Sequence, residues 1–249
     1  MRSSIRSLAL VLGAAAFAAG CVSDEKLVSS GTTVTTPLLA RYVAMGNSIT
    51  AGMQSAGISD ATQKQAYPVL LARMAGVPFN YPSLGLGCPA PFAVPLGPTR
   101  VVNIPGSGCA LRSSFLGLTN NVAVPGEYVA DLTNPLSPGA ANPLSTFING
   151  GLTEAQAMAA LSPTFVTLWA PNNDILNAVN LGDTSATVLT PLATYTAAFT
   201  SAVNAIKAVP TLKGAALIGV VDVPRFAPIV QPGAFFFGAW FSAVSAGKP

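Results

Sequence analysis

The chain of 249 residues contains no histidine, the side chain that most often serves as a general base near neutral pH. Charged residues are scarce as well, at 8% of the chain against about 25% in an average soluble domain. The formal net charge is only +3, so we predict no basic surface for nucleic acid or anionic lipid. So few charges indicate a protein that works outside the cytoplasm.

Several other chemical signals are missing. The three cysteines show no spacing typical of a zinc site, and there is no histidine to complete one. The sequence also has no phosphate-binding Walker loop, no dinucleotide glycine fingerprint after a strand and no Gly-x-Ser-x-Gly elbow. We therefore expect a protein that uses neither a cofactor nor a metal.

Residues 1–20 are typical of an export signal. Arg2 and Arg6 form a basic head, the apolar run Leu8–Ala19 is too short to span a membrane, and small residues precede Cys21. The segment resembles a bacterial lipoprotein signal. That resemblance implies cleavage before Cys21, a lipid anchor on its sulfur, and a place in the cell envelope, facing the periplasm or the exterior. The alternative is an ordinary signal peptide followed by an incidental cysteine.

With Cys21 lipidated, Cys88 and Cys109 remain as an even pair in a compartment where disulfides persist. We expect these two cysteines to be joined, which would staple the Pro-rich and Gly-rich stretch 82–119 to itself. The alternative is that both are buried free thiols.

The rest of the chain reads as a tether and one folded domain. Residues 21–37 are rich in Ser, Thr and Gly, which predicts a flexible linker, and the domain occupies 38–249. Within it, apolar runs predict strands and periodic segments predict helices. The expected strands are 41–46, 77–81, 165–169 and 215–221, of which the first and the last should be buried, with an extended segment at 121–124. The expected helices are 63–75, 127–132, 153–161 and 190–209. In the first of these helices Val69, Leu70, Ala72 and Met74 should face mostly inward. Thr153 and Gln156 resemble a capping box, and Thr190 should be the N-cap of the last helix.

This alternation of strands and helices predicts an α/β fold, a three-layer α/β/α sandwich around a parallel, flavodoxin-like sheet. We expect 133–151 to be irregular. The apolar segment 234–246 is shorter than the roughly 20 residues that a membrane helix needs, and it indicates a core element whose packing partners are missing.

Three polar turns follow strand ends in this scheme. A buried strand runs into Gly46-Asn47-Ser48, which exposes one hydroxyl, while Gly126 and Asn173 follow the segments 121–124 and 165–169. Because the carboxyl ends of parallel strands share one edge of a sheet, these residues are expected to converge there. Taken singly, each has a plainer explanation: a helix cap at Ser48, a turn at Gly126 and a helix N-terminus at Asn172-Asn173-Asp174.

At these positions the chain resembles the SGNH (GDSL-type) hydrolases, in which four short blocks supply one esterase site. Gly46-Asn47-Ser48-Ile49-Thr50 looks like the first block, Asn121 to Gly126 like the second and Asn172 to Ile175 like the third. The resemblance implies a serine esterase or acylhydrolase in which Ser48 attacks a small-molecule, lipid or glycan ester and forms an acyl-enzyme. It also implies that the Gly126 backbone N–H and the Asn173 side chain stabilise the oxyanion.

The match departs from the family pattern at three points. Asn47 stands in place of the usual Asp, Pro171 replaces a Gly and restricts the backbone before Asn173, and the fourth block, Asp-x-x-His, has no counterpart. Asp174 and Asp222 are poor substitutes, since the first suits a helix terminus and the second a turn. We expect the chain to stop before the last strand and helix and to be inactive as it stands; the alternative is a natural variant that lacks the base.

Two rival functions stay open. One is a non-catalytic envelope lipoprotein that binds a glycan or lipid at the same edge of the sheet, and the other is an integral membrane protein, suggested by the mean hydropathy of +0.54. Neither the ester substrate nor the oligomeric state can be predicted from these residues.

Overall fold

The computed structural model describes residues 37–85, 87–89, 91, 93, 117–135, 142–181 and 185–220. The chain divides into two compact units, Met1–Val34 and Thr35–Pro249, and every described residue belongs to the second. The predicted signal and lipid attachment at Cys21, the bulk of the tether, Cys109, Asp222 and the apolar segment 234–246 all lie outside the described residues.

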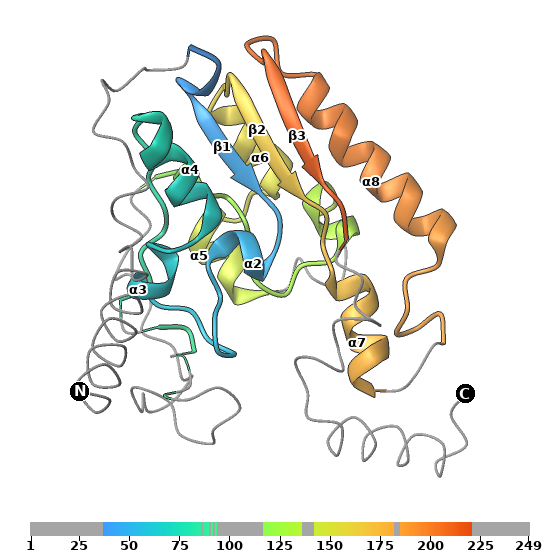
Figure 1. Cartoon of the computed structure of the whole chain (residues 1–249). Coiled ribbons are helices and arrows are strands. Elements are labelled where there is room, and N and C mark those ends of the chain that lie inside the picture. The colour runs from blue at the N-terminus through green and yellow to red at the C-terminus, as the bar shows by residue number, and fades with distance from the viewer. Residues whose placement is uncertain are drawn as a thin grey trace, which may run out of the picture. The chain divides into compact units, whose positions relative to one another are not determined.

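A parallel sheet forms the centre of the described part (Figure 1). Its strands are β1 (Tyr42–Met45), β2 (Phe165–Trp169) and β3 (Gly214–Ile218), in the order β1-β2-β3. The register pairs Met45 with Leu168 and Trp169 with Ile218, so all three strands end at the same edge. This confirms the predicted α/β class and the predicted positions of three strands.

A fourth extended segment runs beside β1. Asn121 forms a parallel bridge with Ala44, and the Ala44 backbone both donates to the Asn120 carbonyl (2.9 Å) and accepts from the Val122 N–H (3.0 Å). The two polar groups of a residue in a parallel strand point to the same side, so this segment lies on the edge of β1 opposite β2. Its carboxyl end at Val124 therefore reaches the same edge of the sheet as the three strands.

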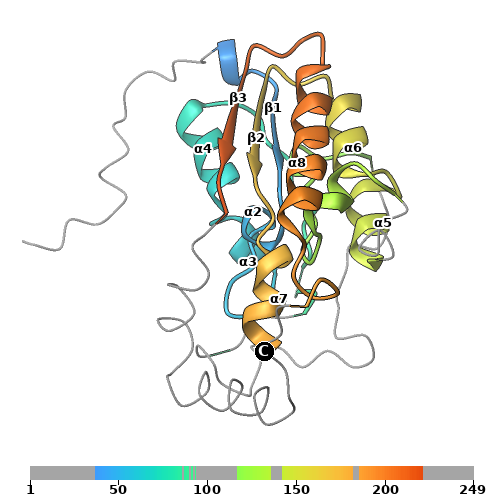
Figure 2. The same cartoon turned by 90° about the vertical axis from the view of Figure 1, so that its right-hand side faces the viewer.

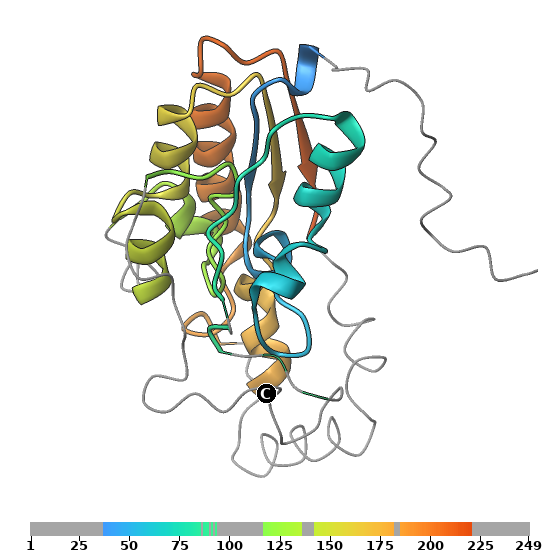
Figure 3. The same ribbon diagram turned by 90° about the vertical axis from the view of Figure 1, so that its left-hand side faces the viewer.

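Helices lie on both faces of the sheet. Figures 2 and 3 show α4 on one face and α6 and α8 on the other, while in Figure 1 α2 and α7 begin where the arrowheads of β1 and β2 end. The helices and 3-10 turns are η2 (Pro37–Leu39), α2 (Ser48–Ala51), α3 (Asp60–Gln63), α4 (Tyr67–Ala75), η3 (Val129–Leu132), α5 (Pro143–Asn149), α6 (Glu154–Ala160), α7 (Asn173–Leu181) and α8 (Leu192–Lys207).

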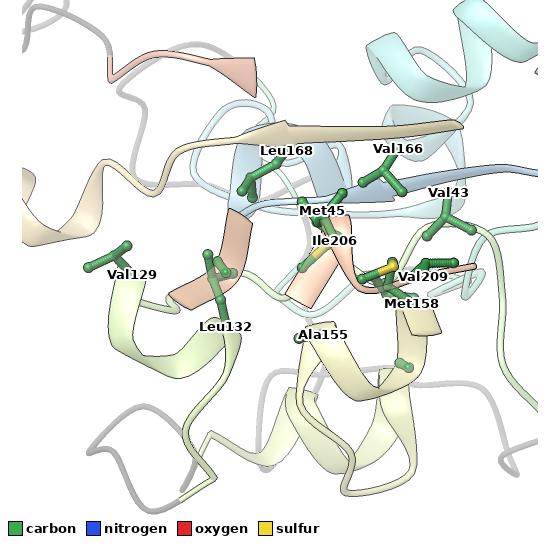
Figure 4. Close-up of a cluster of buried hydrophobic side chains, with 13 residues drawn as sticks. Val43, Met45, Val129, Leu132, Ala155, Met158, Val166, Leu168, Ile206 and Val209 are labelled. Carbon is green, nitrogen blue, oxygen red and sulfur yellow. The ribbon is translucent and has the colours of Figure 1, made fainter. Parts of the chain in front are cut away.

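One face of the sheet packs into the main hydrophobic core. Val43 and Met45 alternate with residues that face the opposite way, as a pleated strand requires, and they join Val166 and Leu168 of β2. Met158 of α6 and Ala202 and Ile206 of α8 cover them, all under 2% exposed (Figure 4). The predicted capping box at the start of α6 is confirmed: the Thr153 side chain accepts from the Gln156 N–H, and the Gln156 side chain accepts from the Thr153 N–H.

The helix predicted over 63–75 is wrong in two respects. It is broken between α3 and α4, because Pro68 has no N–H to donate to the carbonyl of Lys64 in a continuous helix. We also expected Leu70 and Met74 to face inward, yet their side chains are 41% and 73% exposed. Only the face of α4 that carries Ala72 packs against Tyr42 and Ala44 of β1.

Four further expectations need correction. Residues 77–81 form no strand, although the Asn80 carbonyl accepts from the Asn121 N–H. The stretch 133–151 contains α5, capped by Asn142. The strand expected to be buried at 215–221 is β3, and it is not buried: its residues are partly or largely exposed, Leu217 by 50%.

The fourth concerns the start of α8. Thr190 was the expected N-cap, but the helix begins at Leu192 after Pro191 and has no side-chain cap. The Thr190 N–H instead donates to the Asp174 carbonyl at 3.2 Å. Within the described ranges, no helix combines the length and the hydropathy needed to cross a bilayer.

Candidate functional site

Ser48 is the first residue of α2 and directly follows the tight turn that leaves β1. The turn begins at Gly46, where φ is +148°, and a Cβ there would lie 3.0 Å from the Trp169 carbonyl oxygen and would overlap Thr50. Asn47 is buried and caps α2 by accepting a hydrogen bond from the Ile49 N–H at 3.3 Å. Ser48 is partly exposed, and within the described part of the chain neither its hydroxyl nor its N–H is hydrogen-bonded. Both groups can therefore face a ligand.

A buried carboxylate ties this turn to the neighbouring one. Glu154, the first residue of α6, is fully buried; its Oε2 accepts from the Gly46 N–H at 2.8 Å and its Oε1 from the Val124 N–H at 3.0 Å. The two partners precede Ser48 and Gly126, respectively, by two residues. One side chain thus fixes the spacing between the first and second predicted blocks.

Gly126 occupies an exposed turn at the end of the segment beside β1. Its φ is +91°, a conformation that favours glycine, and its N–H has no hydrogen-bond partner within the described ranges. Asn142 steadies the turn by donating from Nδ2 to the Pro125 carbonyl at 2.6 Å. The Gly126 turn is therefore held in place by this hydrogen bond.

Asn173 reaches across to this turn. It is the first residue of α7, and its Nδ2 donates to the Glu127 carbonyl at 2.7 Å. A carboxamide nitrogen carries two hydrogens, so one donor remains for another acceptor. Pro171, which is buried, does not prevent this arrangement.

The three predicted residues lie along a closed series of contacts, which we call the rim. It runs from Gly46 through Glu154 to Val124, then through the Gly126 turn to Asn173, and returns along β2 to Trp169, whose carbonyl lies beside Gly46. The structure joins the Gly126 turn to Asn173 directly, and it links the Ser48 turn to both through Glu154 and Trp169. A backbone N–H, a carboxamide and a serine hydroxyl are groups that can together bind and attack a carbonyl group when they face the same ligand.

The electrostatics below the rim are acidic. Burial, with the negative charge of Asp131 adding to it, raises the pKa of Glu127 to about 8. Burial, followed by the charge of Glu127, raises the pKa of Glu154 well above its ordinary value. Because Glu127 also lies within hydrogen-bonding reach of Glu154, a proton shared by the pair relieves the repulsion between them.

Asp174 does more than we predicted. It lies in the first turn of α7 as expected, but it is 4% exposed and its Oδ2 also accepts from the Val129 N–H at 2.8 Å. Burial raises the pKa of this carboxyl. Asp174 thus fixes η3 against α7, which positions the turn that Asn173 contacts.

The structure bears on the predicted disulfide at one of its two cysteines. Cys88 is disulfide-bonded; its pairing with Cys109 stays a prediction, because Cys109 lies outside the described residues. In the described ranges, no group of three or more Cys, Asp or Glu side chains is arranged to hold a metal ion.

Sequence reasoning missed Glu154. Its position inside a capping-box motif explains it as an acidic residue in the first turn of a helix, and no local pattern marks its contacts with Gly46 and Val124.

Comparisons of this chain with known protein families, with curated proteins and with solved structures found no match.

Proposed function

We propose that this protein is an exported, lipid-anchored serine esterase of the SGNH (GDSL) type, acting on carboxylic esters. The observation that carries the proposal is the hydrogen bond from Asn173 to the Glu127 carbonyl, next to Gly126. This bond brings Asn173 to the turn that contains Gly126, 47 positions earlier in the sequence. The family resemblance assigns both Gly126 and Asn173 to oxyanion binding. The resemblance and the geometry of the rim therefore support the same assignment.

The arrangement of the strands adds support. Counting the extended segment at 121–124 as the second strand, the order across the sheet is 2-1-3-4, which is how a flavodoxin-like order begins. Helices on both faces fit a three-layer α/β/α sandwich. In such sheets, ligands bind at the carboxyl ends of the strands, where the rim lies.

The chemistry follows from the groups at the rim. The Ser48 Oγ attacks the ester carbonyl carbon, its proton passes to a base, and the tetrahedral oxyanion accepts from the N–H groups of Ser48 and Gly126 and from Asn173 Nδ2. The carbon–oxygen bond to the alcohol then breaks, and the proton leaves with that alcohol. Each donor to the oxyanion is worth about 3 kcal/mol in comparable sites. As the sequence contains no histidine, we expect negligible turnover without an added base.

Exogenous imidazole can supply that base. The chain is incubated with p-nitrophenyl acetate and imidazole, and the acetylated residue is identified by mass spectrometry. We expect acetylation at Ser48 that depends on imidazole, is absent in Ser48→Ala and is unchanged in Ser201→Ala, which removes an exposed serine of α8. Equal labelling of Ser48 and other exposed serines would reject a dedicated nucleophile.

The absence of histidine favours one alternative, a non-catalytic envelope lipoprotein that binds a glycan or lipid ester at the same rim. This version keeps the free N–H groups and the carboxamide as ligand donors and needs no base. It predicts saturable ligand binding that Asn173→Ala weakens, with no acetylation of Ser48 at any imidazole concentration.

A further inference from the structure

A hollow of about 520 Å³ lies at the amino ends of the strands, at the edge of the sheet opposite the rim. Its wall includes Arg41, which precedes β1, Thr164, which precedes β2, and Lys213, which precedes β3. The Arg41 N–H donates to the Thr164 hydroxyl oxygen at 3.0 Å, and the Lys213 N–H donates to the Thr164 carbonyl at 2.8 Å. These bonds hold the backbones of Arg41 and Lys213 on either side of Thr164, two strand spacings or roughly 10 Å apart.

The cationic side chains at this edge have no acidic partner. Arg41 and Lys213 are exposed, and within the described ranges neither forms an ion pair, whereas Lys64 pairs with Asp60 at 2.6 Å. Lys207 adds a third exposed cation in the last turn of α8. Figure 1 shows α8 ending at the edge of the sheet where β3 begins. Three positive charges therefore gather at the amino edge.

The acidic side chains of the described ranges lie elsewhere. Apart from Asp60, they are at most 4% exposed and lie towards the carboxyl ends of the strands: Glu127, Asp131, Glu154 and Asp174. The described part of the domain is thus polarised, with exposed cations at one edge and buried acids at the other. The formal net charge of +3, from which we predicted no basic surface, counts charges without regard to their positions.

We propose that the amino edge, which carries Arg41, Lys207 and Lys213, docks onto the anionic headgroups of a phospholipid membrane. Each Lys or Arg held near such a surface adds attraction that falls off within a Debye length. The chain enters the described part at Pro37, which lines the same hollow, sixteen positions after the predicted lipid attachment at Cys21. An anchor at Cys21 therefore offers the bilayer to this edge at a high effective concentration.

Docking of the amino edge turns the rim, at the opposite edge of the sheet, away from the bilayer. The docked surface shares no residue with the rim, and it does not depend on the proposed esterase function. Binding to vesicles needs neither turnover nor lipidation, so it can be measured whether or not Ser48 is ever acylated.

The test measures the partition of the whole chain, made by cell-free synthesis without a lipid, onto vesicles. The vesicles are either pure phosphatidylcholine or an equimolar mixture of phosphatidylcholine and anionic phosphatidylglycerol. Partition coefficients from co-sedimentation are compared for the unaltered chain, Arg41→Gln, Lys213→Gln and the charge-preserving Arg41→Lys. The matched control is Lys64→Gln, which removes one positive charge next to α3. Arg2 and Arg6 are present in every protein, so their contribution cancels.

We expect the unaltered chain to prefer the anionic vesicles. Arg41→Gln and Lys213→Gln should each lower binding to them about fivefold, the contribution of one cation near such a surface, and leave binding to phosphatidylcholine unchanged. Arg41→Lys should bind like the unaltered chain, and Lys64→Gln should change binding less than about twofold.

Three results overturn the proposal. The first is equal binding of the unaltered chain to both kinds of vesicle. The second is a loss in Lys64→Gln as large as that in Arg41→Gln, which would show a response to net charge alone. The third is unchanged binding to the anionic vesicles in both Arg41→Gln and Lys213→Gln.

Discussion

Glu154 gives the sharpest prediction about how the rim is held together. In Glu154→Ala, the N–H groups of Gly46 and Val124 lose their acceptors at 2.8 and 3.0 Å. Each buried, unpaired N–H costs about 1–3 kcal/mol, so the free energy of unfolding should fall by about 2–6 kcal/mol before any effect of the cavity. A domain of this kind has only about 5–15 kcal/mol of stability in total.

Glu154→Gln separates the two hydrogen bonds. The amide keeps one accepting oxygen and turns its NH₂ group towards the other N–H, so we expect a loss of about 1–3 kcal/mol, near half that of the alanine variant. The assay is urea unfolding followed by circular dichroism. Asn204→Ala is the control, because it alters an exposed residue of α8 and should change stability by no more than about 0.5 kcal/mol.

A cost of less than about 1 kcal/mol in Glu154→Ala would show that the Gly46 and Val124 N–H groups do not depend on this carboxylate. A glutamine variant as damaging as the alanine variant would show that the remaining amide oxygen does not replace either acceptor. Amide hydrogen exchange at Gly46 and Val124 offers a local check, because both should exchange faster in Glu154→Ala.

Three further predictions concern the same region. Gly46→Ala should lower the free energy of unfolding by at least about 2 kcal/mol, because the residue has φ +148° and its Cβ would lie 3.0 Å from the Trp169 carbonyl oxygen. Gly126→Ala should cost about 1 kcal/mol, because its Cβ would meet only one side-chain atom, at 3.3 Å. Thermal melts that reverse this order would contradict the prediction. Asn173→Ala removes the hydrogen bond to the Glu127 carbonyl and should lower urea stability by about 1 kcal/mol, so an unchanged midpoint would argue against that contact. The pKa of Glu127 is raised from 4.5 to about 8 in the folded state. Its contribution to stability should therefore be fully present below pH 4.5 and be lost as the pH rises towards 8. Urea unfolding at pH 5 and pH 8.5 tests this, and Glu127→Gln should reduce the fall in the free energy of unfolding between the two pH values.

The elements that the sequence predicted well are those specified by local patterns. The strands β1 and β2 follow from short apolar, β-branched runs, and the start of α6 follows from the capping box at Thr153. The position of the three site residues after strand ends was also predictable, because parallel strands bring their carboxyl ends to one edge.

The features that escaped prediction depend on distant parts of the chain. Glu154 bridges N–H groups that lie 108 and 30 residues away in the sequence, and no local pattern records such a contact. The exposure of Leu217 depends on which elements cover β3, and the break before Tyr67 depends on a single N–H that Pro68 lacks. Helix α5 was hidden by the Pro and Gly residues around it.

We propose that Asn173 stabilises the oxyanion formed when Ser48 is acylated. The most direct measurement is the rate of imidazole-supported acetylation of Ser48 in Asn173→Ala, compared with the unaltered chain and with Asn204→Ala as the control. We expect a rate lower by about 10²–10³ in Asn173→Ala, the effect of losing one oxyanion donor, and an unchanged rate in the control. An equal rate in all three proteins would contradict it.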